Sequence, residues 1–185
     1  MPEQRSSVTV VQPGEGKEGS LGSIGVVFKL FGKDTGGQLS IVEHPFPVGA
    51  LVPPHMHTKE DEFSIVTEGE IGFRSGDEEV VLAAGGYITK PRGELHAMWN
   101  AGKVPARMIE VIQPAGFEGF FWELAEHLAA GRPEPDRVAS IAGRYGLVFA
   151  RAEWLPDVVA RYGLAQPEEV AVEAGEARQS PNASG

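Results

Sequence analysis

The sequence predicts a mostly-β domain, a sandwich or barrel of antiparallel strands, that continues into an α-helical extension. Up to about residue 115, short β-branched or alternating runs are separated by Gly-, Pro- and Asp-rich turns. Many short strands at such spacing are typical of antiparallel sandwiches and barrels. Beyond residues 114–116 the hydrophobic period changes to that of a helix. We therefore divide the chain into a β-domain over residues 1–115, a helical extension over 116–164 and an acidic tail over 165–185.

The strands of the β-domain are expected where apolar or β-branched residues alternate or cluster between turns. The Gly- and charge-rich stretch 13–23 is expected to be a loop. A strand over 55–57 is favoured because Pro53 and Pro54, just before it, disfavour a helix. The other expected strands are residues 8–11, 24–31, 38–44, 62–67, 71–73, 79–82, 87–89, 93–98 and 106–112.

Three helices are expected in the extension, and the first has an aromatic face. The face packs either on the outside of the barrel or on a second subunit, which is the favoured interpretation, or it closes the barrel over an aromatic substrate as a lid. The other helices are expected over 135–145 and 156–162, each followed by a glycine. The tail is acidic and poor in large apolar residues, so we expect it to be disordered. The residues of the aromatic face are Phe117, Phe120, Phe121, Leu124 and Leu128.

The composition limits the partners and the chemistry. The 185 residues carry a formal charge of −10 and include no cysteine. The acidic balance disfavours nucleic acid and anionic membranes as partners, and no apolar stretch approaches the roughly 20 residues of a membrane span. Because the N-terminus shows no secretion signal, we expect a cytoplasmic protein. Without thiolates, any metal must be held by nitrogen and oxygen.

Three of the five histidines lie within residues 49–100, where their spacing suits a metal site. On a strand, His55 and His57 point to the same face, about 6–7 Å apart. Glu62 starts a new strand after a polar turn, and His96 needs a strand from another part of the sheet to approach them. These residues could therefore converge on one cation. The rival carboxylates are Glu60 and Asp61.

The spacing of these residues resembles the two conserved motifs of the cupin superfamily. The matching runs are Gly49-x5-His55-x-His57-x4-Glu62-x6-Gly69 and Gly85-x5-Pro91-x-Gly93-x2-His96-x3-Asn100. The resemblance implies a double-stranded β-helix, or jelly-roll, barrel. It also implies that one divalent transition metal is bound inside the barrel, and it suggests a homodimer, since cupin sheets commonly pair at their edges. The implied ligands are His55, His57, Glu62 and His96.

Ligands of this kind favour a catalytic metal centre. Mixed imidazole and carboxylate ligation favours iron, manganese, nickel, cobalt, copper or zinc over magnesium or calcium. Such a metal can keep positions open for substrate, water or dioxygen. The chain resembles single-domain cupins of the quercetin dioxygenase type, in which the glutamate accepts a proton, so Glu62 is the expected catalytic residue. We therefore expect a dioxygenase-type oxidoreductase that acts on a small phenolic or enolisable compound, with dioxygen as co-substrate.

Two other functions stay open on the same residues. The metal could act as a Lewis acid without dioxygen, in an isomerase or decarboxylase. The chain could also be a non-catalytic cupin that binds a small molecule, which an intact Glu62 disfavours. His44 precedes Pro45 outside both motifs, and a structural or exposed role is favoured over a place at the cavity mouth. The residues expected around the substrate are Phe46, Ser64, Met98, Met108, Phe120 and Phe121.

Overall fold

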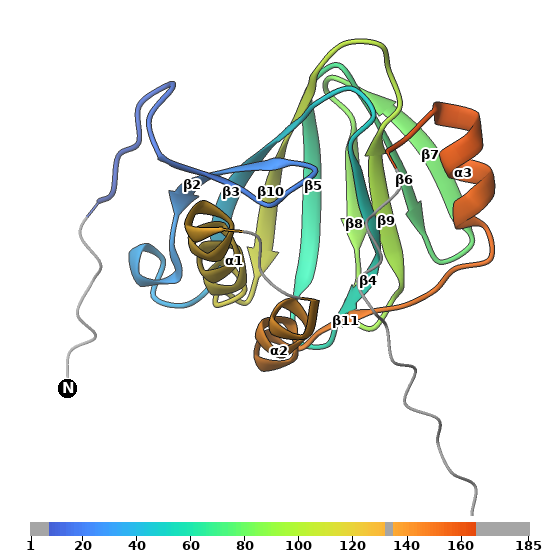
Figure 1. Cartoon of the computed structure of the whole chain (residues 1–185). Coiled ribbons are helices and arrows are strands. Elements are labelled where there is room, and N and C mark those ends of the chain that lie inside the picture. The colour runs from blue at the N-terminus through green and yellow to red at the C-terminus, as the bar shows by residue number, and fades with distance from the viewer. Residues whose placement is uncertain (1–7, 132–134, 166–185) are drawn as a thin grey trace, which may run out of the picture.

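The computed structural model describes residues 8–131 and 135–165, which form two antiparallel β-sheets and three α-helices (Figure 1). Sheet A has the strand order β1-β2-β3-β10-β5-β8, and sheet B has the order β11-β4-β9-β6-β7. This is the jelly-roll architecture with a helical extension that the sequence predicts. The strands are β1 Lys17–Ser20, β2 Gly25–Leu30, β3 Ser40–Phe46, β4 Leu51–His57, β5 Asp61–Glu68, β6 Glu70–Ser75, β7 Glu78–Ala83, β8 Tyr87–Lys90, β9 His96–Asn100, β10 Ala106–Gln113 and β11 Leu147–Phe149.

The strands of sheet A alternate between buried and partly exposed residues, as expected for a sheet with one covered face. On β3 the buried positions include Val42, His44 and Phe46, and on its neighbour β10 they include Met108 and Glu110. Most inward positions are apolar, so a histidine and a glutamate among them are exceptions. Buried polar groups of this kind need hydrogen-bond or charge partners.

A β-bulge in β4 directs the side chain of His55 into the cavity. Val52 is paired with Met98 on β9, whereas His55 is paired with His96, so β4 has one residue more than β9 between these pairs. Pro53 and Pro54 fill this bulge, where the missing amide hydrogens interrupt no regular ladder. The extra residue reverses the alternation, so that Val52 and His55 face the same cavity despite their odd spacing.

The third helix, α3 Leu155–Tyr162, packs on the outer face of sheet B (Figure 1). Its Val158 joins Leu51 and Trp99 in a buried cluster. The Trp99 ring lies over Gly72 on β6, where a Cβ atom would come within 2.2 Å of the indole. Only glycine therefore allows the tryptophan to lie flat on this part of the sheet.

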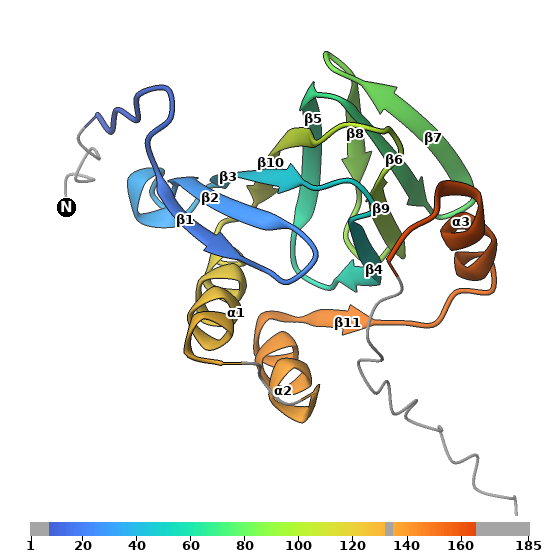
Figure 2. The same ribbon diagram turned by 45° about the horizontal axis from the view of Figure 1, so that its top comes forward.

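The helices α1 Glu118–Ala130 and α2 Pro135–Tyr145 lie beside sheet A and β11 (Figure 2). The aromatic residues at the start of α1 pack against Phe28, Val42 and Ile112 of sheet A. Both carboxylate oxygens of Glu118 accept backbone hydrogen bonds, from Gly32 at 2.8 Å and from Gly116 at 2.6 Å. These bonds anchor the start of α1 to the loop after β2. No helix in the described part of the chain is long and apolar enough to cross a bilayer.

Three local features differ from the sequence prediction. Residues 8–11 form no strand, and β1 lies inside the stretch that was predicted as a loop. The strand β1 has little apolar alternation and is held by its backbone pairing with β2, which a pattern of side chains does not reveal. The strand β11 has three residues, which is too short for a periodic signal. The helices over 135–145 and 156–162 are confirmed, whereas residues 166–185 of the predicted tail lie outside the described residues.

Candidate metal centre

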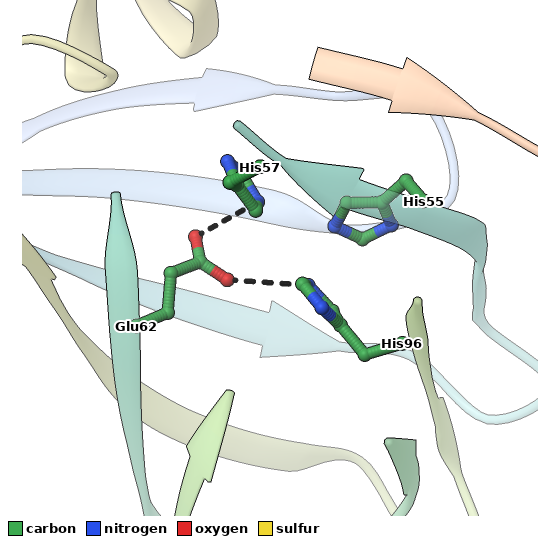
Figure 3. A group of neighbouring side chains, drawn as sticks. All are labelled: His55, His57, Glu62 and His96. Carbon is green, nitrogen blue, oxygen red and sulfur yellow. Dashed lines mark ion pairs between the residues drawn. The ribbon is translucent and has the colours of Figure 1, made fainter. Parts of the chain in front are cut away.

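Four side chains from three strands converge inside the barrel (Figure 3). His55 and His57 come from β4, His96 from β9 and Glu62 from β5. Each offers one ligand atom, and these four atoms lie within 4.8 Å of one another. All four side chains are buried. The structure thus brings together the four residues on which the sequence prediction of a metal site depends.

The Glu62 carboxylate lies between two imidazoles. Its Oε1 is 3.3 Å from Nε2 of His57, and its Oε2 is 3.4 Å from Nε2 of His96. Transition metals bind nitrogen and oxygen ligands at about 2.0–2.2 Å, so adjacent ligand atoms on one ion lie roughly 3 Å apart. The rings of His55 and His96 are also close, with 4.3 Å between their centroids. The cluster therefore has the dimensions of a single-ion site.

Backbone carbonyls set the tautomers of two of the histidines. Nδ1 of His55 is 2.8 Å from the carbonyl of Pro53, and Nδ1 of His96 is 3.1 Å from the carbonyl of Glu94. A carbonyl only accepts, so Nδ1 of each ring carries the hydrogen and Nε2 keeps its lone pair. Metal-binding histidines in proteins are commonly oriented in this way through their second nitrogen.

Buried nitrogen atoms without partners test whether the cluster fits a metal. Within the described residues, Nε2 of His57 and Nε2 of His96 are buried and make no hydrogen bond. Such groups are costly unless something satisfies them, and a divalent transition metal would do so. Nδ1 of His57 also lacks a hydrogen bond and lies 3.9 Å from Oε2 of Glu60. Glu60 therefore lies next to the nitrogen of His57 that faces away from Glu62. Asp61 lies outside the cluster and forms an ion pair with Arg92, with 2.6 Å between the charged atoms.

The electrostatics of the cluster suit metal ligands. Burial lowers the pKa of His57 to about 4 and holds the pKa of His55 well below its ordinary value, so both rings are neutral at pH 7. Burial alone would raise the pKa of Glu62, but the neighbouring His57 and the Lys90 cation keep it well below its usual range. Neutral imidazoles and an ionised carboxylate are the forms that bind metals.

A buried ionic network supports Glu62 from behind. Nζ of Lys90, on β8, lies 2.9 Å from Oε2 of Glu62 and 2.7 Å from Oε2 of Glu110. The Ser64 hydroxyl also reaches Glu110, at 3.0 Å. Lys90 and Glu110 are each only 1% exposed. Burial raises the pKa of Glu110 to about 7, although Lys90 opposes this shift.

A largely apolar cavity of about 510 Å³ opens onto this cluster. Its lining includes the ligands His55, His57 and Glu62 together with three polar residues outside the ligand set, Ser23, His44 and Glu110. A cavity of this size suits a small organic molecule. Its apolar walls come from both sheets and from the helical extension, and include Leu21, Ile24, Val52, Met98, Phe117, Phe120, Phe121, Leu124, Val138, Leu147 and Phe149.

The pocket residues expected from the sequence fall into two groups. Met98, Phe120 and Phe121 line the cavity. Phe46 and Met108 instead belong to the fully buried hydrophobic core and do not reach the cavity lining. Ser64 is buried and serves as a hydrogen-bond donor to Glu110. The alternation of a strand gives the correct face for these last three residues, but it does not tell how far along the strand the cavity extends.

The aromatic face of α1 takes part in the site. The favoured sequence interpretation placed it on the outside of the barrel or on a second subunit, yet Phe117, Phe120 and Phe121 line the cavity. The Phe117 ring contacts His57 edge-on, with 4.2 Å between the ring centroids. These phenylalanines face inward because sheet A leaves its apolar inner face open beside β2 and β3, and α1 covers it.

Sequence reasoning missed several residues of the site. Lys90, Glu110 and the β11 residues Leu147 and Phe149 were not singled out, and His44 was favoured as structural or exposed. The available signal for Glu110 was its position among Ala106, Met108 and Ile112 on one face of β10, where a charge is unusual. No comparable pattern marks Lys90 or β11.

The sequence is similar to one protein family and to several known proteins. The sequence matches the Cupin domain family over residues 43–112, which include all four candidate ligands. Germin-like protein subfamily T member 2 from Arabidopsis thaliana is 40% identical over 76 residues, or 38% of this chain and 34% of that protein. Oxalate oxidase GF-2.8 from Triticum aestivum is 35% identical over 72 residues, or 35% of this chain and 32% of that protein. The chain spans about a third of the length of these relatives.

Solved structures show the same architecture. KdgF from Halomonas sp. superimposes with a TM-score of 0.55 and 18% sequence identity, over 61% of this chain and 99% of that chain. At this identity the likeness concerns the fold alone, because one fold carries many functions.

Proposed function

Since this chain belongs to the cupin superfamily, we propose that it is a metal-dependent oxidoreductase of the dioxygenase type that acts on a phenolic or enolisable small molecule. The observation that carries the proposal is the convergence of three imidazoles and one carboxylate at the wall of a largely apolar cavity. The partial similarity to a protein named oxalate oxidase supports redox chemistry at such a site. Retention of all four ligand types supports the narrower comparison with quercetin dioxygenase.

Different residues of the chain would have different roles in this reaction. A bound divalent transition metal would supply a Lewis acid for an enolate or phenolate oxygen and a place for dioxygen. Oε1 of Glu62 can take the proton of the substrate hydroxyl, because an ionised carboxylate within hydrogen-bond reach is a general base. Lys90 contacts the other oxygen of Glu62 at 2.9 Å and fixes its orientation. The phenylalanines of α1 exclude water from the reacting groups.

Oxygen consumption by the protein loaded with a defined metal tests the proposal. The protein is purified anaerobically, loaded in turn with iron, manganese, nickel, cobalt, copper or zinc, and mixed with a panel of flavonols and diketones. We expect oxygen uptake with product formation for at least one redox-active metal. The change Glu62→Gln should lower the rate by about 10²- to 10⁴-fold, the usual contribution of a general base.

A neighbouring carboxylate provides the matched control. Asp61 precedes Glu62 on the same strand but pairs with Arg92 outside the cluster, so Asp61→Asn should leave oxygen uptake near the wild-type rate. Full activity of the Glu62→Gln variant would contradict the proposed role of Glu62. Binding of the whole panel without turnover under any metal would instead identify a non-catalytic binding protein.

The alternative of an isomerase or decarboxylase gains support from Glu110. Its pKa of about 7 allows it to give or take a proton near neutral pH, and it lines the same cavity. Proton movement is what an isomerisation needs, without dioxygen. Product formation under strict exclusion of oxygen would favour this alternative over the oxygenase.

A further inference from the structure

His44 is a buried polar residue of the cavity that the metal centre does not use. It lies on β3, which pairs with β10, and only 2% of its surface is exposed to solvent. Its side chain lines the cavity together with the candidate ligands. It is not one of the four clustered ligand residues, which come from β4, β5 and β9. A polar side chain at such a place needs a partner.

The chemistry of the His44 ring leaves one nitrogen available as an acceptor. Nδ1 is 2.8 Å from the carbonyl of Gly25, which only accepts, so Nδ1 carries the hydrogen and donates. Burial lowers the pKa of His44 to about 4, so the ring is neutral at pH 7 and Nε2 keeps its lone pair. Edge-on contact with Phe121, at 5.1 Å between ring centroids, fixes the plane of the ring.

The rest of the cavity wall restricts the charge of a ligand. Among the described residues, no lysine or arginine lines the cavity. The two acidic residues that line it are Glu62 and Glu110. Lys90 lies behind them, where both of its short contacts go to these carboxylates. A small dianion such as oxalate would therefore have only the metal to balance it, and it would leave most of the apolar wall without contact.

We propose that the substrate is an uncharged, mostly apolar ring compound that binds the metal through one oxygen and donates a hydrogen bond from a second, separate hydroxyl group to Nε2 of His44. The proposal rests on the proposed function in one respect, the presence of a metal at the four ligands. It adds the class of substrate and a residue that selects it. The cavity of about 510 Å³ is large enough for a molecule of two or three rings.

Ligand binding to the zinc-loaded protein tests this without turnover, because zinc has no redox chemistry. The probes are 3-hydroxyflavone, its derivatives with one further hydroxyl on either ring, the methyl ether of each derivative, and oxalate. Dissociation constants are measured by fluorescence or calorimetry. We expect at least one hydroxyl derivative to bind about 3- to 10-fold more tightly than its methyl ether, the worth of one hydrogen bond. Oxalate should bind at least about 10-fold more weakly than 3-hydroxyflavone.

Two variants separate the two nitrogens of the ring. In His44→Asn the amide reaches the position of Nδ1 and can keep the bond to Gly25, but no acceptor reaches the cavity. In His44→Gln the amide reaches the position of Nε2 and can still accept. The preference for the hydroxyl derivative should disappear in His44→Asn and persist in His44→Gln, with the zinc content of both unchanged.

The outcomes for substrate class and for catalysis are distinguishable. Equal binding of every hydroxyl derivative and its methyl ether, or an unchanged preference in His44→Asn, would overturn the role of His44. Tighter binding of oxalate than of 3-hydroxyflavone would overturn the substrate class. The protein could prefer the hydroxyl derivative in a way that depends on His44 and yet consume no oxygen with any metal. That result would support this inference and contradict the proposed oxygenase activity.

Discussion

The two sheets bring different chemistry to one cavity. Sheet B supplies the three imidazoles, and two of them are oriented by the backbone carbonyl two residues earlier in the chain. Sheet A supplies the charges, since Lys90 contacts Glu62 at 2.9 Å and Glu110 at 2.7 Å, and the three residues come from neighbouring strands. Two of the three nitrogen ligands are thus positioned locally, whereas the oxygen ligand depends on contacts between strands. Changes on the two sheets should therefore have different consequences.

Removal of the central cation of sheet A should have the largest effect. In Lys90→Met, Glu62 and Glu110 remain buried without their shared partner. Loss of one member of a buried ionic group costs about 3–5 kcal/mol, because the remaining charges are not compensated. Urea unfolding of the metal-free protein measures this loss.

A second variant distinguishes charge from packing at Lys90. At pH 9, above the pKa of about 7 of Glu110, folding of Lys90→Met must keep Glu110 either charged and uncompensated or protonated against the pH, so the double variant Lys90→Met with Glu110→Gln should be more stable than Lys90→Met alone. Equal stability of the two variants would show that lost packing, rather than uncompensated charge, explains the effect.

Removal of a sheet B ligand should act on metal affinity more than on stability. His57→Ala or His96→Ala leaves three ligands, and we expect the affinity for zinc to fall by about 100-fold or more, or about 3 kcal/mol. Metal analysis after dialysis and calorimetric titration measure the change. His127→Ala, on α1 outside the cluster, is the matched control and should keep the full metal content. Unchanged stoichiometry in both ligand variants would contradict the assignment.

The pH dependence of stability should have opposite signs at His57 of sheet B and at Glu110 of sheet A in the metal-free protein. His57 has a pKa of about 4 in the folded state against an ordinary 6.5, so the unfolded chain binds more protons between these values and stability falls as the pH drops. Glu110 has a pKa of about 7 against an ordinary 4.5, so the folded chain binds more protons and stability falls as the pH rises through this window. Each effect is at most about 3 kcal/mol.

The change Glu110→Gln sharpens this comparison. It removes the opposing contribution of Glu110, so the free energy of unfolding should rise more steeply between pH 4.5 and pH 7 than in the wild type. Urea unfolding at several pH values gives the two curves. Curves of the same slope would mean that Glu110 titrates alike in the folded and unfolded states.

Loss of a neutral member of the network should have the smallest effect. Ser64→Ala removes the hydroxyl that donates to Glu110 at 3.0 Å, while Lys90 still contacts that carboxylate. We expect a loss of about 1 kcal/mol in urea unfolding. A loss as large as that of Lys90→Met would show that Glu110 depends on the hydroxyl as much as on the cation.

Sequence reasoning succeeded where chemistry is encoded by spacing along the chain. The alternation on a strand placed His55 and His57 on one face, and the fixed motif spacing added Glu62 and His96. Helix periodicity likewise gave the aromatic face of α1. The alternation and the helix periodicity need only local geometry, whereas the assignment of Glu62 and His96 rests on the resemblance to the cupin motifs.

The remaining parts of the site depend on contacts between distant segments. Lys90 and Glu110 meet because β8 and β10 both pair with β5, which is a matter of strand order. Leu147 and Phe149 reach the cavity because β11, which follows α2, pairs with β4 although the two strands are far apart in sequence. His44 looked like a strand residue before a proline, and only the closure of the barrel places it in the cavity. Neither composition nor periodicity records such pairings.

The short strand β11 has a consequence for how two copies of the chain can assemble. It runs antiparallel to β4, with Leu147 opposite His57 and Phe149 opposite His55, and so occupies the free side of the strand that carries both histidines. A second chain therefore cannot extend sheet B by hydrogen-bonding to β4. In a homodimer built by strand addition, the subunits would have to join through β1, β7, β8 or the three residues of β11. Such a joint would leave the histidine-bearing strand fully within its own subunit.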